Sequence, residues 1–432
     1  MIMKASIILI LIFAILLAVG IPIAISIAIA SISTVLFVLP LDIAVFTSAQ
    51  KMVTSIDSFS LVAVPFFMLS GIIMNHGGIA QKLIDLAKLV GGRIPGSLAH
   101  TNIIGNSLFG SISSSAIAAS TAIGGVMVPS QVNEGYDRKF AAAVNIASAP
   151  TGMLIPPSTA FIIYSLISGG TSISALFMSG LTIGLLWAVA IMIVSYIIAK
   201  KRNYPVVQKK ENQNIKKIVL DAIPSLFLII IIIGGILTGI FTAIEASAIS
   251  VVYSLFLALV YYRTLTMKQL PEVFIKTIEL TGVIMFLISA SSLMTFTMAF
   301  TGMPEALSNF VLNISENPII ILLIINIVLL LVGAVMDIAP AILIFTPIFL
   351  PIATELGLDP IHFGAFFIFN LCIGTITPPV GTGLFVGASI AQLRIEQVII
   401  PLIPFYIGIF VILMLVTYIP QISLFLPNIL NL

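Results

Sequence analysis

Apolar residues run along this chain in segments of about twenty, separated by short stretches that are polar or rich in glycine and proline. A helix that crosses a bilayer needs about 20 such residues, so the pattern predicts an all-α polytopic membrane protein with about ten crossings. The predicted crossings are residues 5–20, 22–39, 59–75, 138–168 and 173–199 in the first half, and 222–239, 244–262, 272–299, 358–392 and 397–426 in the second.

Two further apolar regions, residues 97–128 and 318–350, are interrupted in the middle by small polar residues. Each interruption falls where a continuous helix would be at mid-membrane. Lipid permits irregular backbone at that depth only where protein surrounds it. We therefore expect two re-entrant hairpins, each entering and leaving on one side. Residues 78–93 and 303–316, beside the hairpins, look amphipathic and suit the membrane interface.

The distribution of charge predicts how the chain is oriented in the membrane. Only 8% of the residues are charged, against about a quarter in a soluble domain. When the basic linker 200–221 is placed in the cytoplasm, sixteen of the 18 lysines and arginines fall on that side, and Lys4 and Lys51 fall outside. The positive-inside rule expects this asymmetry. It predicts a bacterial inner-membrane protein with both termini in the periplasm. The scattered basic residues give no sign of nucleic-acid binding.

The two halves of the chain share a pattern under a shift of 222 residues. The polar interruption at 110–115 then lies within a residue of 333–337. Other matches are Pro129 with Pro351, Gly135 with Gly357, Gly152 with Gly374, and Pro156-Pro157 with Pro378-Pro379. Each half has five crossings, so the second half, 222–432, is inverted relative to the first, 1–199. Inverted repeats with broken helices are typical of secondary transporters, whose site lies between the repeats.

Both 138–168 and 358–392 contain a glycine followed by a Pro-Pro pair in an otherwise apolar run. Proline removes a hydrogen-bond donor and clashes with the preceding turn, so each pair breaks its helix. Freed carbonyls can bind a cation, and the restarted helix offers N–H groups to an anion. A simple structural kink is the alternative, since membrane helices tolerate proline. The matched positions favour a binding site.

Polar residues at the hairpin interruptions suggest cation sites. Ser111, Ser113, Ser114 and Ser115 offer hydroxyl oxygens of the kind that sodium prefers, although small residues also allow close helix packing. Asp337 is the acid that the layout places deepest, and an intramembrane carboxylate is by default a functional hypothesis. The alternative is that Asp337 faces water at a solvated tip. We expect no lysine or arginine deep in a span, so an anionic substrate would rely on helix N-termini and bound cations.

Several segments resemble the large membrane subunit of tripartite ATP-independent periplasmic (TRAP) transporters. Residues 239–246 read Gly-Ile-Phe-Thr-Ala-Ile-Glu-Ala, and residues 152–158, 333–351 and 370–385 carry the resemblance further. The resemblance runs nearly end to end. It implies a sodium-driven importer of an organic acid such as sialic acid or a C4-dicarboxylate, with sodium ions as cofactors and an elevator mechanism. It also implies two partners, a separate small four-helix membrane subunit and a periplasmic substrate-binding protein.

The resemblance further implies where the ions and the substrate bind. Sodium site 1 would lie between the first hairpin and the first break, and sodium site 2 between the second hairpin and the second break. The residues are Ser111, Ser113, Ser115 and Gly152 for sodium site 1; Gly333, Val335, Asp337, Gly374 and Thr377 for sodium site 2; and Ser114, Ser115, Pro156, Ser158, Thr159, Pro378 and Gly381 for the substrate.

We therefore expect a sodium/organic-anion symporter subunit and not an enzyme. The sequence has no phosphate-binding Walker loop, and His76, His100 and His362 are isolated from one another along the chain. Within the transporter class, the alternative is a stand-alone carboxylate symporter of similar fold. From another class, the alternative is an ion channel. The sequence leaves open which organic acid is carried.

Overall fold

The computed structural model describes residues 2–76, 79–91, 94–205, 215–303, 306 and 317–432, and the regular structure in them is helical. The first half contains α1 (Ile2–Ala18), α2 (Ile23–Val38), α3 (Leu41–Ile56), η1 (Phe59–Val62), α4 (Ala63–His76), α5 (Ile79–Gly91), α6 (Ser97–Ser113), α7 (Ala116–Asn133), α8 (Arg138–Ser148), α9 (Thr151–Leu154), α10 (Thr159–Ile167) and α11 (Ile173–Lys201). The second contains α12 (Ile215–Leu237), α13 (Ala243–Leu255), the π-helical turn η2 (Phe256–Tyr261), α14 (Leu270–Phe300), α16 (Pro318–Val335), α17 (Ile338–Glu355), α18 (Pro360–Gly374), α19 (Thr382–Ile390), α20 (Ile395–Tyr418) and α21 (Pro420–Ile429).

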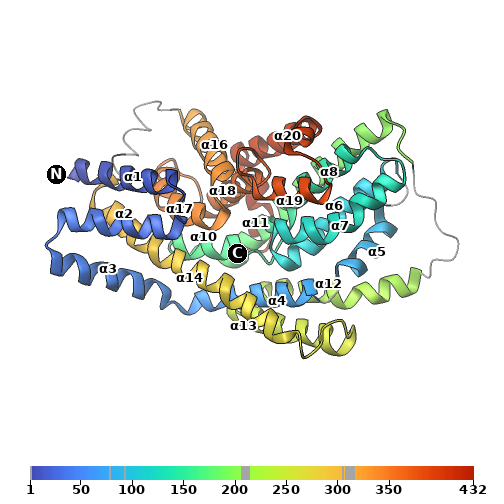
Figure 1. Ribbon diagram of the computed structural model, residues 1–432, viewed down its shortest axis with the longest axis horizontal. Helices are drawn as coiled ribbons and strands as arrows, with labels where there is room; N and C mark the ends of the chain where they lie inside the picture. Colours follow the sequence, from blue (N-terminus) through green and yellow to red (C-terminus); the bar gives the residue numbers. More distant parts are fainter. Residues whose placement is uncertain (1, 77–78, 92–93, 206–214, 304–305, 307–316) are drawn as a thin grey trace.

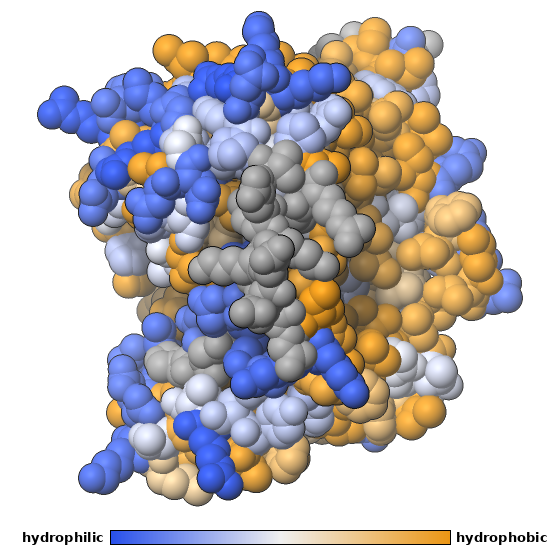
Figure 2. Space-filling model, turned by 90° about the vertical axis from the view of Figure 1, so that its right-hand side faces the viewer, coloured by the Kyte–Doolittle hydropathy of each residue, from blue (hydrophilic) through white to orange (hydrophobic). Residues whose placement is uncertain are grey.

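The predicted all-α polytopic class is confirmed. Within the described residues, seven helices are long and apolar enough to span a membrane, or eight if α8–α9 and α10, bent by 48°, form one span. Shorter apolar helices, including α1, α2, α4 and α18, add to these. Figure 2 shows hydrophobic residues covering one flank of the molecule, with hydrophilic residues gathered along another edge. An apolar exterior of this extent is suited to lipid.

One predicted crossing is unexpectedly divided in the structure. Helix α3 lies in residues where no crossing is predicted, and it is not among the described helices that are long and apolar enough to span a membrane. The predicted crossing 397–426 is two helices, since α20 ends at Tyr418 and α21 begins at Pro420. The predicted amphipathic segment 303–316 lies almost entirely outside the described residues, whereas its counterpart 78–93 contains α5.

Helix packing follows the repeat. Under the 222-residue shift, α4 corresponds to part of α14, and α2 corresponds to α13. Helix α4 packs on α13, and α14 packs on α2, so the same contact occurs twice with the halves exchanged. The pair α7–α19 likewise corresponds to α17–α10, and both pairs are in contact. This exchange is the arrangement expected of two repeats related by a pseudo-two-fold axis.

The elements that surround the candidate site fall into two groups. Figure 1 shows α1, α2 and α3 stacked beside one another, with α14 passing along them, while α16, α18, α19 and α20 gather above α11 in that view. Helix α14 also packs against α4 and α17. We call α2, α3, α4, α13 and α14 the scaffold helices, and α6–α10 with α16–α19 the hairpin and break helices. The site lies where the two groups meet.

Candidate functional site

The first interruption is a tight turn held against the first break. Helix α6 ends at Ser113, and Ser114 then adopts a left-handed backbone conformation with φ 50°. The Ser115 hydroxyl caps α7 by accepting a hydrogen bond from the Ala118 N–H at 3.2 Å. The Ser114 hydroxyl donates to the carbonyl of Pro157, in the break of the α8–α10 segment. This hydrogen bond holds the turn of the first hairpin against the first break.

The second interruption is attached to the second break by backbone groups. Helix α16 ends at Val335, and Asp337 in extended conformation begins α17 without capping it through its side chain. The Val380 N–H donates to the Ala334 carbonyl at 3.1 Å, and Val380 lies in the break between α18 and α19. In both halves, then, a hairpin turn and a Pro-Pro break are hydrogen-bonded to each other.

In each half, glycines allow the backbone of the hairpin to touch the backbone of the broken helix. A Cβ atom added to Gly110 would lie 2.5 Å from the Cα of Gly152, and one added to Gly374 would lie 2.2 Å from the carbonyl carbon of Gly333. Such distances are well inside van der Waals contact, so neither position has room for a side chain. The close approach brings the backbone of each hairpin beside that of its break. In each half, this contact brings together the hairpin and the break that were predicted to form one sodium site.

The predicted ion-site hydroxyls are oriented by local hydrogen bonds. Ser111 donates to the Leu108 carbonyl at 2.8 Å, Ser113 to Gly110 at 3.5 Å, and Thr377 to Ile373 at 2.8 Å. A hydroxyl that donates its hydrogen keeps two acceptor lone pairs, which a cation can use. Val335 is 55% exposed and Asp337 is also exposed. Occupation of these sites by an ion stays a prediction.

A cavity of about 530 Å³ lies between the hairpin turns, the breaks and the scaffold. We call it the hairpin cavity. Hairpin and break residues that line it are Ser113, Ser114, Ser115, Thr121, Met153, Thr159, Asp337, Ile338, Thr375 and Thr382, and scaffold residues that line it are Met68, Gly71, Ile72 and Asn75 of α4 with Lys276, Leu280 and Ile284 of α14. Both halves thus contribute to one cavity. Its volume is that of a small-molecule site.

The predicted substrate residues divide into two groups. Ser114, Ser115 and Thr159 line the hairpin cavity. Pro156, Ser158, Pro378 and Gly381 are not among its described lining residues and instead shape the breaks. Both Pro-Pro bonds are cis. Ser158 is buried and donates to the Met153 carbonyl at 2.5 Å, and Gly381 has φ 26°, with the Thr377 carbonyl oxygen 2.6 Å from any added Cβ.

Lys276 was not expected in the cavity. The sequence pattern assigns it to the cytoplasmic charges, and on that pattern we expect helix N-termini and bound cations, not a basic residue, to hold an anion. Residues 276, 280 and 284 of α14 lie on one helical face, and this face lines the cavity. The four-residue spacing was the signal that could have located it. Among the described residues, neither Lys276 nor Asp337 forms an ion pair.

Buried side-chain amides hold each hairpin to its break helix. Asn145 of α8 donates to the Ser120 hydroxyl of α7 at 2.9 Å and accepts from Asn106 of α6 at 3.1 Å. In the second half, Asn370 of α18 donates to Asn326 of α16 at 2.6 Å. Hydrogen bonds between buried polar groups are costly to break. Each hairpin and its break helix therefore form one connected unit.

Comparison with known proteins agrees with this arrangement. The family model described as tripartite ATP-independent periplasmic transporter, DctM component, matches residues 10–422. The sialic acid TRAP transporter large permease protein SiaM of Vibrio cholerae is 38% identical over 381 residues, which are 88% of this chain and 89% of that protein. The C4-dicarboxylate TRAP transporter large permease protein DctM of Rhodobacter capsulatus is 35% identical over 414 residues, which are 93% and 94% of the two chains.

A solved structure shares the fold at low sequence identity. The YdaH transporter of Alcanivorax borkumensis superimposes with a TM-score of 0.66 and 13% identity, covering 88% of this chain and 89% of that one. The family match over nearly the whole chain shows which family this is. With its apolar helices, two-half packing and hairpin cavity, the chain belongs to the large membrane subunits of the TRAP transporters.

Proposed function

We propose that this transporter subunit imports a small organic anion by coupling it to the entry of sodium ions, with the hairpin cavity as the substrate site. The observation that carries this proposal is the composition of the cavity wall. Both hairpin turns, both breaks and two scaffold helices meet there, and the described wall combines serine and threonine hydroxyls with a single lysine. A polar site enclosed between two repeats suits a solute that must cross the membrane.

Sodium is the cation that the surrounding chemistry favours. The crossings of Gly110 with Gly152 and of Gly333 with Gly374 place backbone carbonyls and serine or threonine hydroxyls beside each other. Oxygen ligands of this kind suit a hard cation. Bound sodium would offset the charge of an organic anion near Asp337, so that each ligand strengthens the binding of the other.

The connections within each half support an elevator movement. Hydrogen bonds hold each hairpin to its break, and buried amides strengthen both joints. These helices can therefore move as one body against the scaffold helices, which pack on one another through α4 with α13 and through α14 with α2, α3 and α4. Rigid-body movement of one part of a repeat structure against the other is a recognised form of alternating access.

Membership in the family implies a small membrane subunit and a periplasmic substrate-binding protein as partners, and a multi-pass location in the inner membrane. We propose that the small subunit is a separate four-helix chain and that both termini face the periplasm, because this orientation places sixteen of the 18 lysines and arginines in the cytoplasm. The substrate class of the named relatives, sialic acid or a C4-dicarboxylate, is the starting point for choosing candidate anions.

Uptake into liposomes tests the proposal. The chain is reconstituted with its small subunit, and the cognate binding protein loaded with radiolabelled anion is added outside. An inward sodium gradient should drive uptake, and replacing external sodium with potassium should abolish it. Unchanged uptake in potassium would contradict sodium coupling. Sodium-driven uptake without the binding protein would instead indicate a stand-alone symporter, and uptake far faster than carrier turnover would indicate a channel.

A further inference from the structure

A second cavity, of about 410 Å³, lies beside α3 and has no assigned role. We call it the α3 cavity. Its wall comes from α3, α10, α14 and α17, with Ser58 and Leu61 from the segment after α3. Lys51 is the charged residue among its described lining residues, and Ser55, Ser292 and Thr295 supply hydroxyls. The cavity therefore combines one positive charge with several hydroxyl oxygens.

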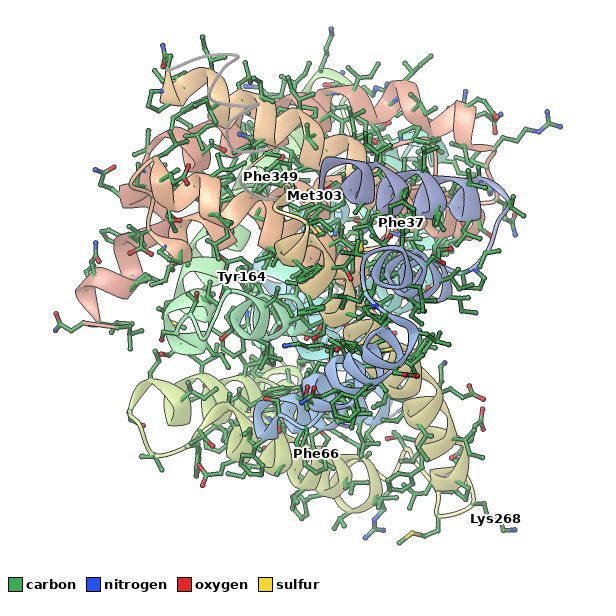
Figure 3. All side chains as sticks on the ribbon, turned by 90° about the vertical axis from the view of Figure 1, so that its left-hand side faces the viewer. Phe37, Phe66, Tyr164, Lys268, Met303 and Phe349 are labelled. Carbon is green, nitrogen blue, oxygen red and sulfur yellow. The ribbon has the colours of Figure 1, made fainter. Side chains whose placement is uncertain are left out.

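The α3 cavity and the hairpin cavity lie one after the other along the same helices. On α14, residues 276–284 line the hairpin cavity and residues 288–299 line the α3 cavity. Ile163 of α10 lines both. Figure 3 shows α14 running across the molecule between Lys268, just before it, and Met303, just after it. The two cavities thus follow one another along α14, with Ile163 in the wall of both, as consecutive compartments on one path would.

Each compartment has one described lysine, and both lysines belong to scaffold helices. Lys276 lies near the start of α14 and Lys51 lies on α3. The charge asymmetry of the sequence places Lys276 toward the cytoplasm and Lys51 toward the outside. The α3 cavity is therefore on the side where an imported solute arrives. The two lysines on the scaffold helices can therefore bind the anion in turn, one in each cavity.

Lys51 is held in place but keeps its capacity to bind an anion. Its ammonium group lies 5.0 Å from the centre of the Phe296 ring, also in the cavity wall. Contact with a ring face restricts the long side chain without neutralising its charge. Lys51 forms no ion pair with any residue that the structure describes. A carboxylate in the cavity could therefore take its hydrogen bonds.

The hydroxyls indicate what else the ligand carries. Ser55 donates to the Met52 carbonyl at 2.9 Å, and Thr295 donates to the Ser291 carbonyl at 3.0 Å. In the hairpin cavity, Thr121 likewise donates to the Ile117 carbonyl at 2.8 Å. A hydroxyl that already donates its hydrogen to a carbonyl can only accept a hydrogen bond from a ligand, so the ligand must supply a donor. A carboxylate offers none, whereas the hydroxyl groups of a sugar acid do.

We propose that the α3 cavity is a receiving site for a hydroxylated monocarboxylate on the outer side of the path, with Lys51 binding the carboxylate and the lining hydroxyls accepting from the ligand's own hydroxyls. The proposal rests on the proposed function and narrows its substrate class. An unhydroxylated C4-dicarboxylate fits less well, because its second carboxylate has no described positive partner in the wall and the acceptor hydroxyls have no donor to bind.

The test compares Lys51→Gln and Lys51→Arg with Lys268→Gln, a lysine outside both cavities, in liposomes of known orientation. Lys51→Gln should raise the KM for entry about tenfold or more, the loss expected for a charge-assisted hydrogen bond. Its kcat should change little, and Lys51→Arg should restore most of the affinity. Exit from the hairpin-cavity side should keep its KM. An unchanged entry KM in Lys51→Gln, or an equal rise in both directions, would overturn the proposal.

Thermal stabilisation identifies the ligand class. N-acetylneuraminate or gluconate should stabilise the purified protein in detergent, without the binding protein, at a lower concentration than succinate, and stronger stabilisation by succinate would overturn the assignment. If the unmodified protein shows no sodium-driven uptake, the proposed function is wrong, but the α3 cavity can still be tested separately. The α3 cavity is then tested by gluconate-induced thermal stabilisation of Lys276→Gln protein in detergent. Adding Lys51→Gln should remove the remaining stabilisation, and its persistence would refute the site.

Discussion

Where Gly333 and Gly374 cross, the absence of side chains decides how close the second hairpin comes to its break. A methyl group on Gly374 would lie 2.2 Å from the Gly333 carbonyl carbon. We expect Gly374→Ala to separate the two backbones and to lower the free energy of unfolding by about 1–3 kcal/mol, as overpacking does. Sodium should then stabilise the variant less than the unmodified protein, which thermal unfolding at increasing sodium concentrations measures.

A matched glycine serves as the control for this prediction. Gly125 of α7 has no described atom within 4 Å of an added Cβ, so Gly125→Ala should keep both its stability and its response to sodium. If Gly374→Ala unfolds at the same temperature as Gly125→Ala and responds equally to sodium, the glycine crossing has no part in the ion site.

Asp337 is the exposed acid beside the second hairpin turn. Its exposed carboxylate lines the hairpin cavity at the start of α17, where no ion pair with another described residue neutralises it. If Asp337 takes part in sodium binding, Asp337→Ala should raise the sodium concentration needed for half-maximal uptake. Glu396→Gln, an exposed acid at the start of α20, is the control. A sodium titration that matches the control would mean that Asp337 merely faces water.

Part of the site could be predicted from the sequence. Gly152 and Gly374 could be singled out because each precedes a Pro-Pro break, and the structure shows that both touch a hairpin glycine. Lys276 and Lys51 were seen only as charges that fix the orientation. A count of charges carries no information on which helical face a side chain occupies, and the cavities form only when helices far apart in the sequence meet.

At the scale of the helices, Asn145 connects three elements. Its side chain bonds to Ser120 of α7 and to Asn106 of α6 from within α8. We expect Asn145→Ala to lower the free energy of unfolding by about 1–3 kcal/mol, because Asn106 and Ser120 lose buried partners. The thermal unfolding midpoint of the purified protein measures the change.

The comparison variant is Ser130→Ala, whose hydroxyl makes a local bond to the Val126 carbonyl near the end of α7. Its effect should stay within about 0.5 kcal/mol, as for most surface positions. Equal midpoints for the two variants would show that the amide contacts do not hold the first hairpin to its break helix.

Helices with a long apolar run could be predicted from the sequence, whereas α3 and the division between α20 and α21 could not. Helix α11 needs a continuous run of apolar residues, and the sequence has one. Helix α3 is short and carries Asp42 and Lys51, so its helical state depends on packing against α2 and α14 rather than on its own apolar pattern. The division between α20 and α21 at Pro420 was overlooked because apolar residues continue through it.

Across the whole molecule, we expect hairpin residues and scaffold residues of the hairpin cavity to differ in whether their exposure changes during transport. The native Cys372 is buried, so an introduced cysteine can be labelled selectively. Thr121→Cys, on α7, should react with a membrane-impermeant thiol reagent from the cytoplasmic side in one state and from the outside in the other. Leu280→Cys, on α14, should stay accessible from one side. Labelling of Thr121→Cys that does not change during turnover would contradict an elevator.

The central claim is that sodium and the organic anion cross together. The most direct test is to measure the entry of radioactive sodium into liposomes containing the chain and its small subunit, with and without binding protein loaded with the anion. We expect the loaded binding protein to accelerate sodium entry in fixed proportion to anion entry, and Asp337→Ala to weaken both. Anion entry without any acceleration of sodium entry would contradict it.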